Sequence, residues 1–173
     1  MKGSVFVGVS VDGFMARPDG RFDFLPEGGG EEHGYTEFMK TIDAMLIGRK
    51  TYDVVLAFPG WAYGKTPVYV LSSKPLAPAP EGAIVERMCG DPKEITVQLD
   101  ARGVRRAYVD GGETIQAFLR AGLIDRIIVT RVPVLVGEGI SLFGPTGRDV
   151  ALRHVVTRTY ASGLVTSEYE VAG

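Results

Sequence analysis

Glycine, serine or charged residues stand at four places where a run of apolar residues ends. These places are residues 10–13, 48–51, 71–74 and 110–115. Glycine lets the backbone come close to a phosphate, and the start of a helix offers it free N–H groups and a favourable dipole. Arg49 can add a bidentate contact, and Ser72 and Ser73 can donate hydrogen bonds. The pattern predicts a phosphate-binding site, although the turn alone explains a glycine at any one junction equally well.

Other familiar sites are missing from the sequence. No Gly-x-Gly-x-x-Gly follows the first apolar run. Segment 59–66 departs from a P-loop because Pro59 replaces its first glycine and an apolar strand follows it. Cys89 is the only cysteine, and His33 and His154 are far apart, so we expect neither a disulfide nor a metal site. No serine or cysteine has an evident catalytic partner.

The composition favours a globular protein that binds a small molecule. The 173 residues fit a single domain, 1–173, and the 45% of apolar residues is ample for a core. The net charge of −2 comes from 19 basic and 21 acidic residues in a mixed pattern. It argues against a nucleic-acid or membrane partner, because both need a concentrated basic field. No run approaches the ~20 apolar residues of a spanning helix, and we expect a cytoplasmic protein.

The elements that position these residues alternate between strand and helix. Most predicted strands are apolar throughout, which is typical of a parallel sheet covered on both faces. Two alternating segments joined by Ser162-Gly163 predict a closing antiparallel hairpin. Residues 17–34, with Gly28-Gly29-Gly30, predict a long loop. Strands are predicted at 5–11, 44–47, 67–71, 83–86, 106–109, 126–132, 154–160 and 164–169, and helices at 31–41, from 49, at 91–103 and at 113–121.

Taken together and in order, these motifs resemble the dihydrofolate-reductase-like superfamily. The similar segments are residues 9–13, 46–52, 70–73 and 108–112. Within that superfamily, residues 109–143 are most similar to the reductase domain of the bifunctional deaminase/reductase of riboflavin biosynthesis. The zinc deaminase half of that enzyme has no counterpart here. The resemblance implies a three-layer αβα fold, with a mixed, mostly parallel sheet and a C-terminal antiparallel hairpin.

The resemblance also implies NADPH as the cofactor. Arg49, Ser72 and Ser73 would hold the 2′-phosphate end, while Lys50 and Thr51 would lie at the pyrophosphate. A cis peptide bond is implied between Gly111 and Gly112. The implied cofactor-binding set is Gly48, Arg49, Lys50, Thr51, Leu71, Ser72, Ser73, Gly111, Gly112, Glu113, Thr114 and Ile115.

Reduction also needs a proton source. In this superfamily a carboxylate of the first helix, shortly after a Leu-Pro pair, is central, and Glu32 is the candidate here. The alternative role, which the position favours, is that of a solvated acid at the helix start. Asp12 is a second catalytic or substrate-binding candidate, or simply the acid of its turn. Glu138 is a further carboxylate near the expected substrate, and Trp61 either walls the substrate pocket or belongs to the core.

We therefore expect an NADPH-dependent reductase of a small heterocyclic substrate. The resemblance favours the 5-amino-6-(5-phosphoribosylamino)uracil reductase type. A pteridine or dihydrofolate reductase, and a non-catalytic NADPH-binding sensor, are the alternatives. Related reductase domains form homodimers, and we expect the C-terminal hairpin to serve that purpose.

Overall fold

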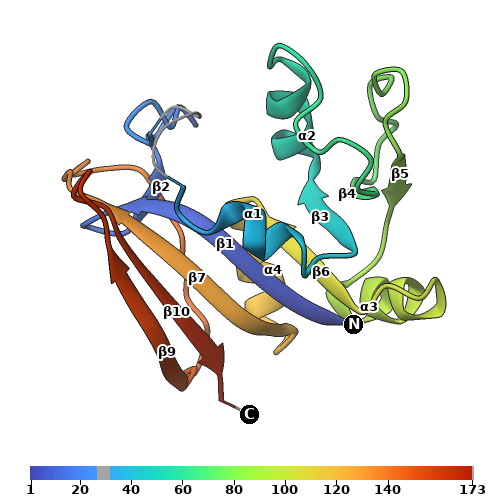
Figure 1. Ribbon diagram of the computed structural model, residues 1–173. Helices are drawn as coiled ribbons and strands as arrows, with labels where there is room; N and C mark the ends of the chain where they lie inside the picture. The colour runs from blue at the N-terminus through green and yellow to red at the C-terminus, as the bar shows by residue number, and fades with distance from the viewer. Residues whose placement is uncertain (27–31, 173) are drawn as a thin grey trace.

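Eight strands form one central sheet in the computed structural model, which describes residues 1–26 and 32–172. Their order across the sheet is β5-β4-β3-β6-β1-β7-β10-β9. The first six strands of this order, from β5 across to β7, are parallel to one another. Strand β10 is antiparallel to β7, and β9 is antiparallel to β10. The strands of this sheet are β1 Lys2–Ser10, β3 Ala44–Gly48, β4 Val68–Leu71, β5 Val85–Met88, β6 Arg106–Asp110, β7 Ile124–Val132, β9 Leu152–Thr159 and β10 Val165–Val171 (Figure 1).

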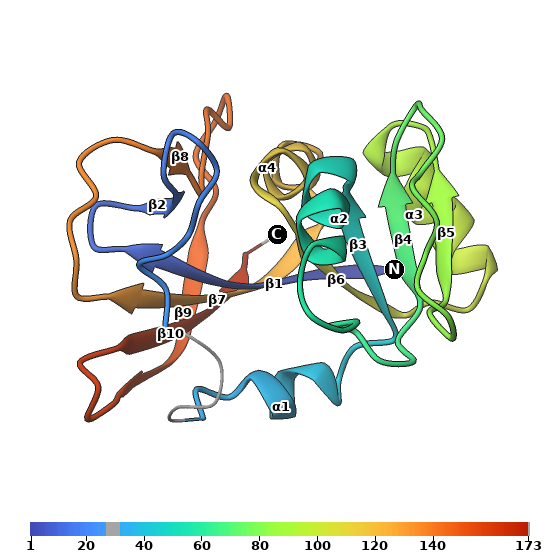
Figure 2. The same cartoon turned by 90° about the horizontal axis from the view of Figure 1, so that it is seen from above.

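Helices cover both faces of this sheet. They are α1 Tyr35–Met39, α2 Arg49–Leu56, α3 Pro92–Ala101 and α4 Gly112–Arg120. Phe38 of α1 and Tyr52 of α2 are buried in the core of one face, whereas Ile95 of α3 and Phe118 of α4 are buried in the core of the other. Seen from above, α1 and α4 lie on opposite sides of β1 and β6 (Figure 2). The expected three-layer αβα fold is confirmed.

The apolar runs form strands because both of their faces are buried. Ala44, Met45, Leu46 and Ile47 of β3 are fully buried, and they alternate between the two cores. Helix α3 begins where its sequence predicts. The Asp91 side chain accepts from the N–H groups of Lys93 and Glu94, and Glu94 accepts from the Asp91 N–H. This reciprocal capping satisfies N–H groups that a helix start leaves free.

Some boundaries differ from the prediction. Helix α1 begins at Tyr35, not at residue 31, because Gly34 has a left-handed φ of 89°. Strand β5 spans Val85–Met88, two residues later than expected. A small sheet of β2 Phe14–Ala16 and β8 Ile140–Ser141 was not expected, because neither segment is long enough to show an alternating pattern. The predictions for Gly28-Gly29-Gly30 and Glu31 lie outside the described residues.

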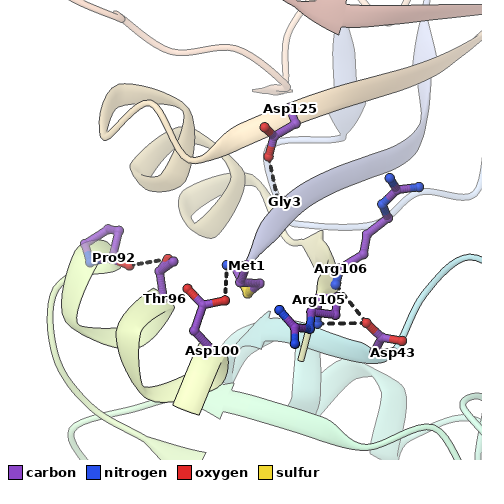
Figure 3. Close-up of polar contacts among 9 residues, drawn as sticks. All are labelled: Met1, Gly3, Asp43, Pro92, Thr96, Asp100, Arg105, Arg106 and Asp125. Atoms are coloured by element: carbon purple, nitrogen blue, oxygen red, sulfur yellow. Dashed lines mark hydrogen bonds and ion pairs between the residues drawn. The ribbon is translucent and has the colours of Figure 1, made fainter. Parts of the chain in front are cut away.

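Polar contacts tie together the edge of the sheet where the parallel strands begin. One Asp43 carboxylate oxygen accepts from the backbone N–H groups of Arg105 and Arg106, each at 2.8 Å. Asp125 accepts from the Gly3 N–H at 3.1 Å, and Asp100 pairs with the amino group of Met1 (Figure 3). These side chains hold strand starts in register. In open α/β sheets, ligands bind beyond the carboxyl ends of the strands, so we look for the site at the opposite edge.

The C-terminal hairpin completes the sheet. Glu168 of β10 pairs with Arg126 of β7 at 2.7 Å, and the buried hydroxyls of Thr130 and Thr166 are 2.8 Å apart. Strand β9 is left as an edge strand, and most of its side chains are exposed. Within residues 1–26 and 32–172, no helix is both long and apolar enough to cross a membrane.

Candidate functional site: two helix starts at the C-terminal edge of the sheet

Two glycines bring the starts of α2 and α4 together. Gly48 ends β3 directly before α2, and Gly111 follows β6 directly before α4. A side chain at Gly48 would come within 2.9 Å of Thr114 Oγ1, and one at Gly111 would collide with Thr51 Oγ1. The absence of both Cβ atoms is what allows this approach. The structure thus unites Gly48, Thr51, Gly111 and Thr114, which the sequence had placed at separate junctions.

The paired helix starts suit an anionic ligand. Neither Gly48 nor Gly111 can cap its helix with a side chain, and no other side chain takes that role in the described structure. The free first-turn N–H groups and the helix dipoles favour phosphate. Lys50 and Glu113, one from each helix, form an ion pair of 2.7 Å across the gap, and both side chains are more than four-fifths exposed. Such an exposed pair contributes little stability and leaves Lys50 free to exchange partners.

The loop after β4 lies next to the start of α2. Leu71 pairs with Gly48 in the parallel register, and Ser72 follows with its N–H bonded to the carbonyl of Met88. The Ser72 hydroxyl accepts from the Lys74 N–H and donates to the Lys74 carbonyl, which folds the loop back on itself. Arg49 is 3.6 Å from Asp53 of its own helix. Arg49 and the Ser72-Ser73 loop therefore occupy neighbouring strand ends, as the resemblance implies.

The connection from Gly111 to Gly112 corrects one expectation. No peptide bond in the described chain is cis, so the bond between these two glycines is trans. Gly111 makes the turn instead, with φ 92° and ψ 129°, a conformation open to glycine alone among common residues. Ile115, another residue of the implied cofactor set, lies in the first turns of α4. Its side chain is buried in the core, and its N–H donates to the Gly111 carbonyl within the helix.

The small sheet of β2 and β8 covers Gly112. A side chain at Gly112 would lie 3.0 Å from Met15 Sδ of β2 and 3.5 Å from Ile140 of β8. Asp12 holds this cover in place, since its carboxylate accepts from the N–H groups of Val136 at 3.2 Å and Gly137 at 2.8 Å. A hydrogen bond from Ser10 is the main cause that lowers the pKa of Asp12, and these two N–H groups add to it. Asp12 is thus placed as an ionised anchor, and its pKa is unsuited to proton donation.

Asp110 is the carboxyl group that sequence reasoning did not assign to catalysis. It is the last residue of β6, directly before Gly111, and burial raises its pKa. Burial, followed by the negative charge of Asp110, also raises the pKa of Tyr35, Tyr63 and Tyr108. These three hydroxyl-bearing rings come from α1, the loop after α2, and β6. A charged residue that ends an otherwise buried strand was the signal in the sequence.

Aromatic side chains gather on the face of the sheet that α1 and α2 cover. The rings of Tyr35 and Tyr108 are 6.5 Å apart, and those of Trp61 and Tyr63 are 5.3 Å apart. Trp61 is half-buried, packs against the core of the α1 face, and has a buried Nε1 that finds no hydrogen-bond partner in residues 1–26 and 32–172. A donor of this kind suits a pocket wall that awaits an acceptor. Trp61 therefore packs against the core, and its place in a substrate pocket stays a prediction.

Two other predicted carboxylates lie elsewhere. Glu32 accepts from the N–H of Thr36 at 3.1 Å, and this hydrogen bond is the main cause that lowers its pKa. The contact is that of an acid holding the first turn of α1, which was the alternative role. Glu138 is exposed in the loop between β7 and β8, one residue after Gly137. The structure does not bring Glu32 or Glu138 into contact with Asp110.

The fold and the glycine-started helices define a dihydrofolate-reductase-like domain. Dihydrofolate reductase from Enterococcus faecalis, solved with NADP(H), shares this fold with a TM-score of 0.64, at 16% identity and with 99% of this chain and 97% of that chain covered. The chain belongs to the family of the RibD C-terminal domain, whose family model matches residues 2–166.

Two solved structures are similar over nearly all of this chain. A putative riboflavin biosynthesis protein from Shewanella sp. PV-4 is 31% identical, with both chains covered completely and a TM-score of 0.87. The deaminase/5-amino-6-(5-phosphoribosylamino)uracil reductase of Thermotoga maritima is 14% identical, with a TM-score of 0.72 over 99% of this chain and 56% of that chain. The suspected superfamily and family are confirmed, and they support a riboflavin-pathway type of reductase.

Proposed function

We propose that this protein is an NADPH-dependent reductase of a small heterocyclic substrate. The observation that carries the proposal is the contact between two helix starts that lack side-chain caps, made possible by Gly48 and Gly111. Such a contact can bind both phosphates of a dinucleotide through backbone N–H groups. Lys50 would add charge at the pyrophosphate, and Arg49 with the Ser72-Ser73 loop would face the 2′-phosphate. The residues present fit the cofactor.

The substrate side of the proposal rests on Asp110. When bound, NADPH supplies a hydride, and the protein must hold the acceptor and provide a proton. Asp110 is suited to provide it because its raised pKa keeps a proton on the carboxyl to higher pH. Asp12 and Glu32 are less suited, since the pKa of each is lowered. We assign proton donation to Asp110 and the ring contacts to Tyr35, Tyr63 and Trp61.

The substrate class follows from family membership. The Thermotoga maritima relative is a reductase of 5-amino-6-(5-phosphoribosylamino)uracil. That reduction would deliver a hydride to the sugar-imine carbon and a proton to its nitrogen. Trp61 and the tyrosines offer flat apolar surfaces for a pyrimidine ring. We infer the same reaction type for this chain.

A titration followed by a turnover assay tests this function. Purified protein is titrated with NADPH and NADH by cofactor fluorescence. Loss of absorbance at the reduced-nicotinamide band is then followed with the pyrimidine substrate and with dihydrofolate. Tight NADPH binding and turnover of the pyrimidine are expected. Turnover of dihydrofolate alone would make the protein a folate reductase, binding without turnover would make it a sensor, and failure to bind either dinucleotide would refute the proposal.

A further inference from the structure

Arg87 is a basic side chain of the cofactor edge that the sequence did not single out. It lies in β5, the edge strand next to β4 (Figure 1), and pairs with Val70 in the parallel register. Its Nη1 donates to the Ser72 carbonyl at 3.1 Å, so its guanidinium lies against the loop proposed to face the 2′-phosphate. Val85, two residues earlier in the same strand, packs against the core that contains Tyr52 of α2. Since side chains two apart in a strand share a face, Arg87 is on the α2 face.

Within residues 1–26 and 32–172, no carboxylate pairs with Arg87. Glu86, its chain neighbour, is on the opposite face and pairs at 2.7 Å with Arg102, the residue that follows α3. Asp53 is beside Arg49, and Glu113 is taken by Lys50. In the described part of the chain, Arg87 donates its side-chain hydrogen bond to the Ser72 carbonyl. An arginine carries five N–H donors in a planar fork, so most of its donors face solvent at this edge.

We propose that Arg87 binds the 2′-phosphate of NADPH and determines the preference for NADPH over NADH. The inference rests on the proposed function and adds a specificity-determining residue to it. A phosphate monoester dianion would supply the counter-charge that Arg87 lacks, and the guanidinium fork matches two of its oxygens. The bond to the Ser72 carbonyl orients the fork in advance. Arg49 approaches the same ligand from α2 but already has Asp53 beside it.

Binding of paired ligands with and without the phosphate tests this role. Dissociation constants are measured for NADPH and NADH by fluorescence, and for adenosine 2′,5′-bisphosphate and 5′-AMP by calorimetry. The proteins are the wild type, Arg87→Ala, Arg87→Lys and the control Arg158→Ala. Arg158 suits the comparison because it is an exposed arginine on β9, the other edge strand of the sheet.

We expect Arg87→Ala to weaken the binding of NADPH and of the bisphosphate by about tenfold or more, because hydrogen bonds to a charged group are lost. NADH and 5′-AMP should change less than twofold. Arg87→Lys should recover part of the loss, because it keeps the charge without the fork, and Arg158→Ala should match wild type.

The outcomes separate this inference from the proposed function. If the wild type prefers NADPH and Arg87→Ala leaves that preference unchanged, Arg87 does not read the phosphate, while the reductase proposal stands. Equal weakening of NADPH and NADH would likewise overturn the inference. If the wild type binds none of the four ligands, both proposals fail together.

Discussion

Replacing Gly111 by alanine tests the contact on which the cofactor site depends. Alanine at φ 92° and ψ 129° is strained, and such conformations cost about 1–3 kcal/mol. Its Cβ would also collide with Thr51 Oγ1, and overpacking of this kind costs a further ~1–3 kcal/mol. We therefore expect Gly111→Ala to lower the free energy of unfolding by about 2–6 kcal/mol.

Gly103→Ala is the matched control. Gly103 also has a left-handed φ, 83°, but nothing lies within 4 Å of the position of its Cβ. Only backbone strain should appear there, about 1–2 kcal/mol. Because Gly103 is distant from the cofactor edge, NADPH affinity should stay at the wild-type value. Gly111→Ala should also weaken the binding of NADPH, since the collision of the new Cβ with Thr51 pushes the two helix starts apart.

A second substitution isolates the collision. Thr51→Ala removes the hydroxyl that the new Cβ would meet, whereas the Thr51 Cβ, at 3.6 Å, is at an ordinary contact distance. The double variant Thr51→Ala/Gly111→Ala should therefore regain about 1 kcal/mol or more relative to Gly111→Ala alone.

Urea unfolding of the four variants and the wild type measures these differences. The reasoning is refuted if Gly111→Ala costs no more than Gly103→Ala. It is equally refuted if removal of the Thr51 hydroxyl recovers nothing.

Three further predictions concern the substrate side, the phosphate end and the assembly. Asp110→Asn should lower turnover by about 10²-fold or more with NADPH affinity retained, and full activity would contradict the role. Because burial raises the folded-state pKa of Asp110, its carboxylate lowers the free energy of unfolding once the pH passes the unfolded-state pKa. The variant should therefore unfold at higher urea than wild type at pH 7, but not at pH 3. Arg49→Ala should weaken NADPH about tenfold and NADH little, and equal weakening in the same fluorescence titration would count against Arg49. Light scattering should find a homodimer that lysines at the exposed Leu152 and Val155 of β9 convert to monomer, and a wild-type monomer would exclude it.

Much of the fold follows from local sequence. The buried run 44–47 is apolar at every position and forms β3, because only a strand covered on both faces buries all of them. Asp91 and Glu94 supply a cap that needs no distant partner, so the start of α3 was predicted correctly. Gly48 and the Gly111-Gly112 pair were recognised as helix starts for the same reason, since each is defined by the strand and helix beside it.

Contacts between distant segments decided the rest. The pKa of Asp110 is raised because the fold shields its carboxyl from solvent, and no local pattern in the sequence indicates that shielding. Arg87 reaches the Ser72 carbonyl across 15 residues of chain, and Asp12 reaches Gly137 across 125.

The Gly111-Gly112 junction shows the same division. Its glycines predict a turn before a helix from the sequence alone. The trans bond and the close approach of Thr51 are visible only in the tertiary structure, where α2 packs beside the junction. Sequence alone determined which segments could bind a phosphate, since that depends on neighbours along the chain. The tertiary structure decided which side chains share the site, because burial, charge pairing and steric contact arise only between segments that folding brings together.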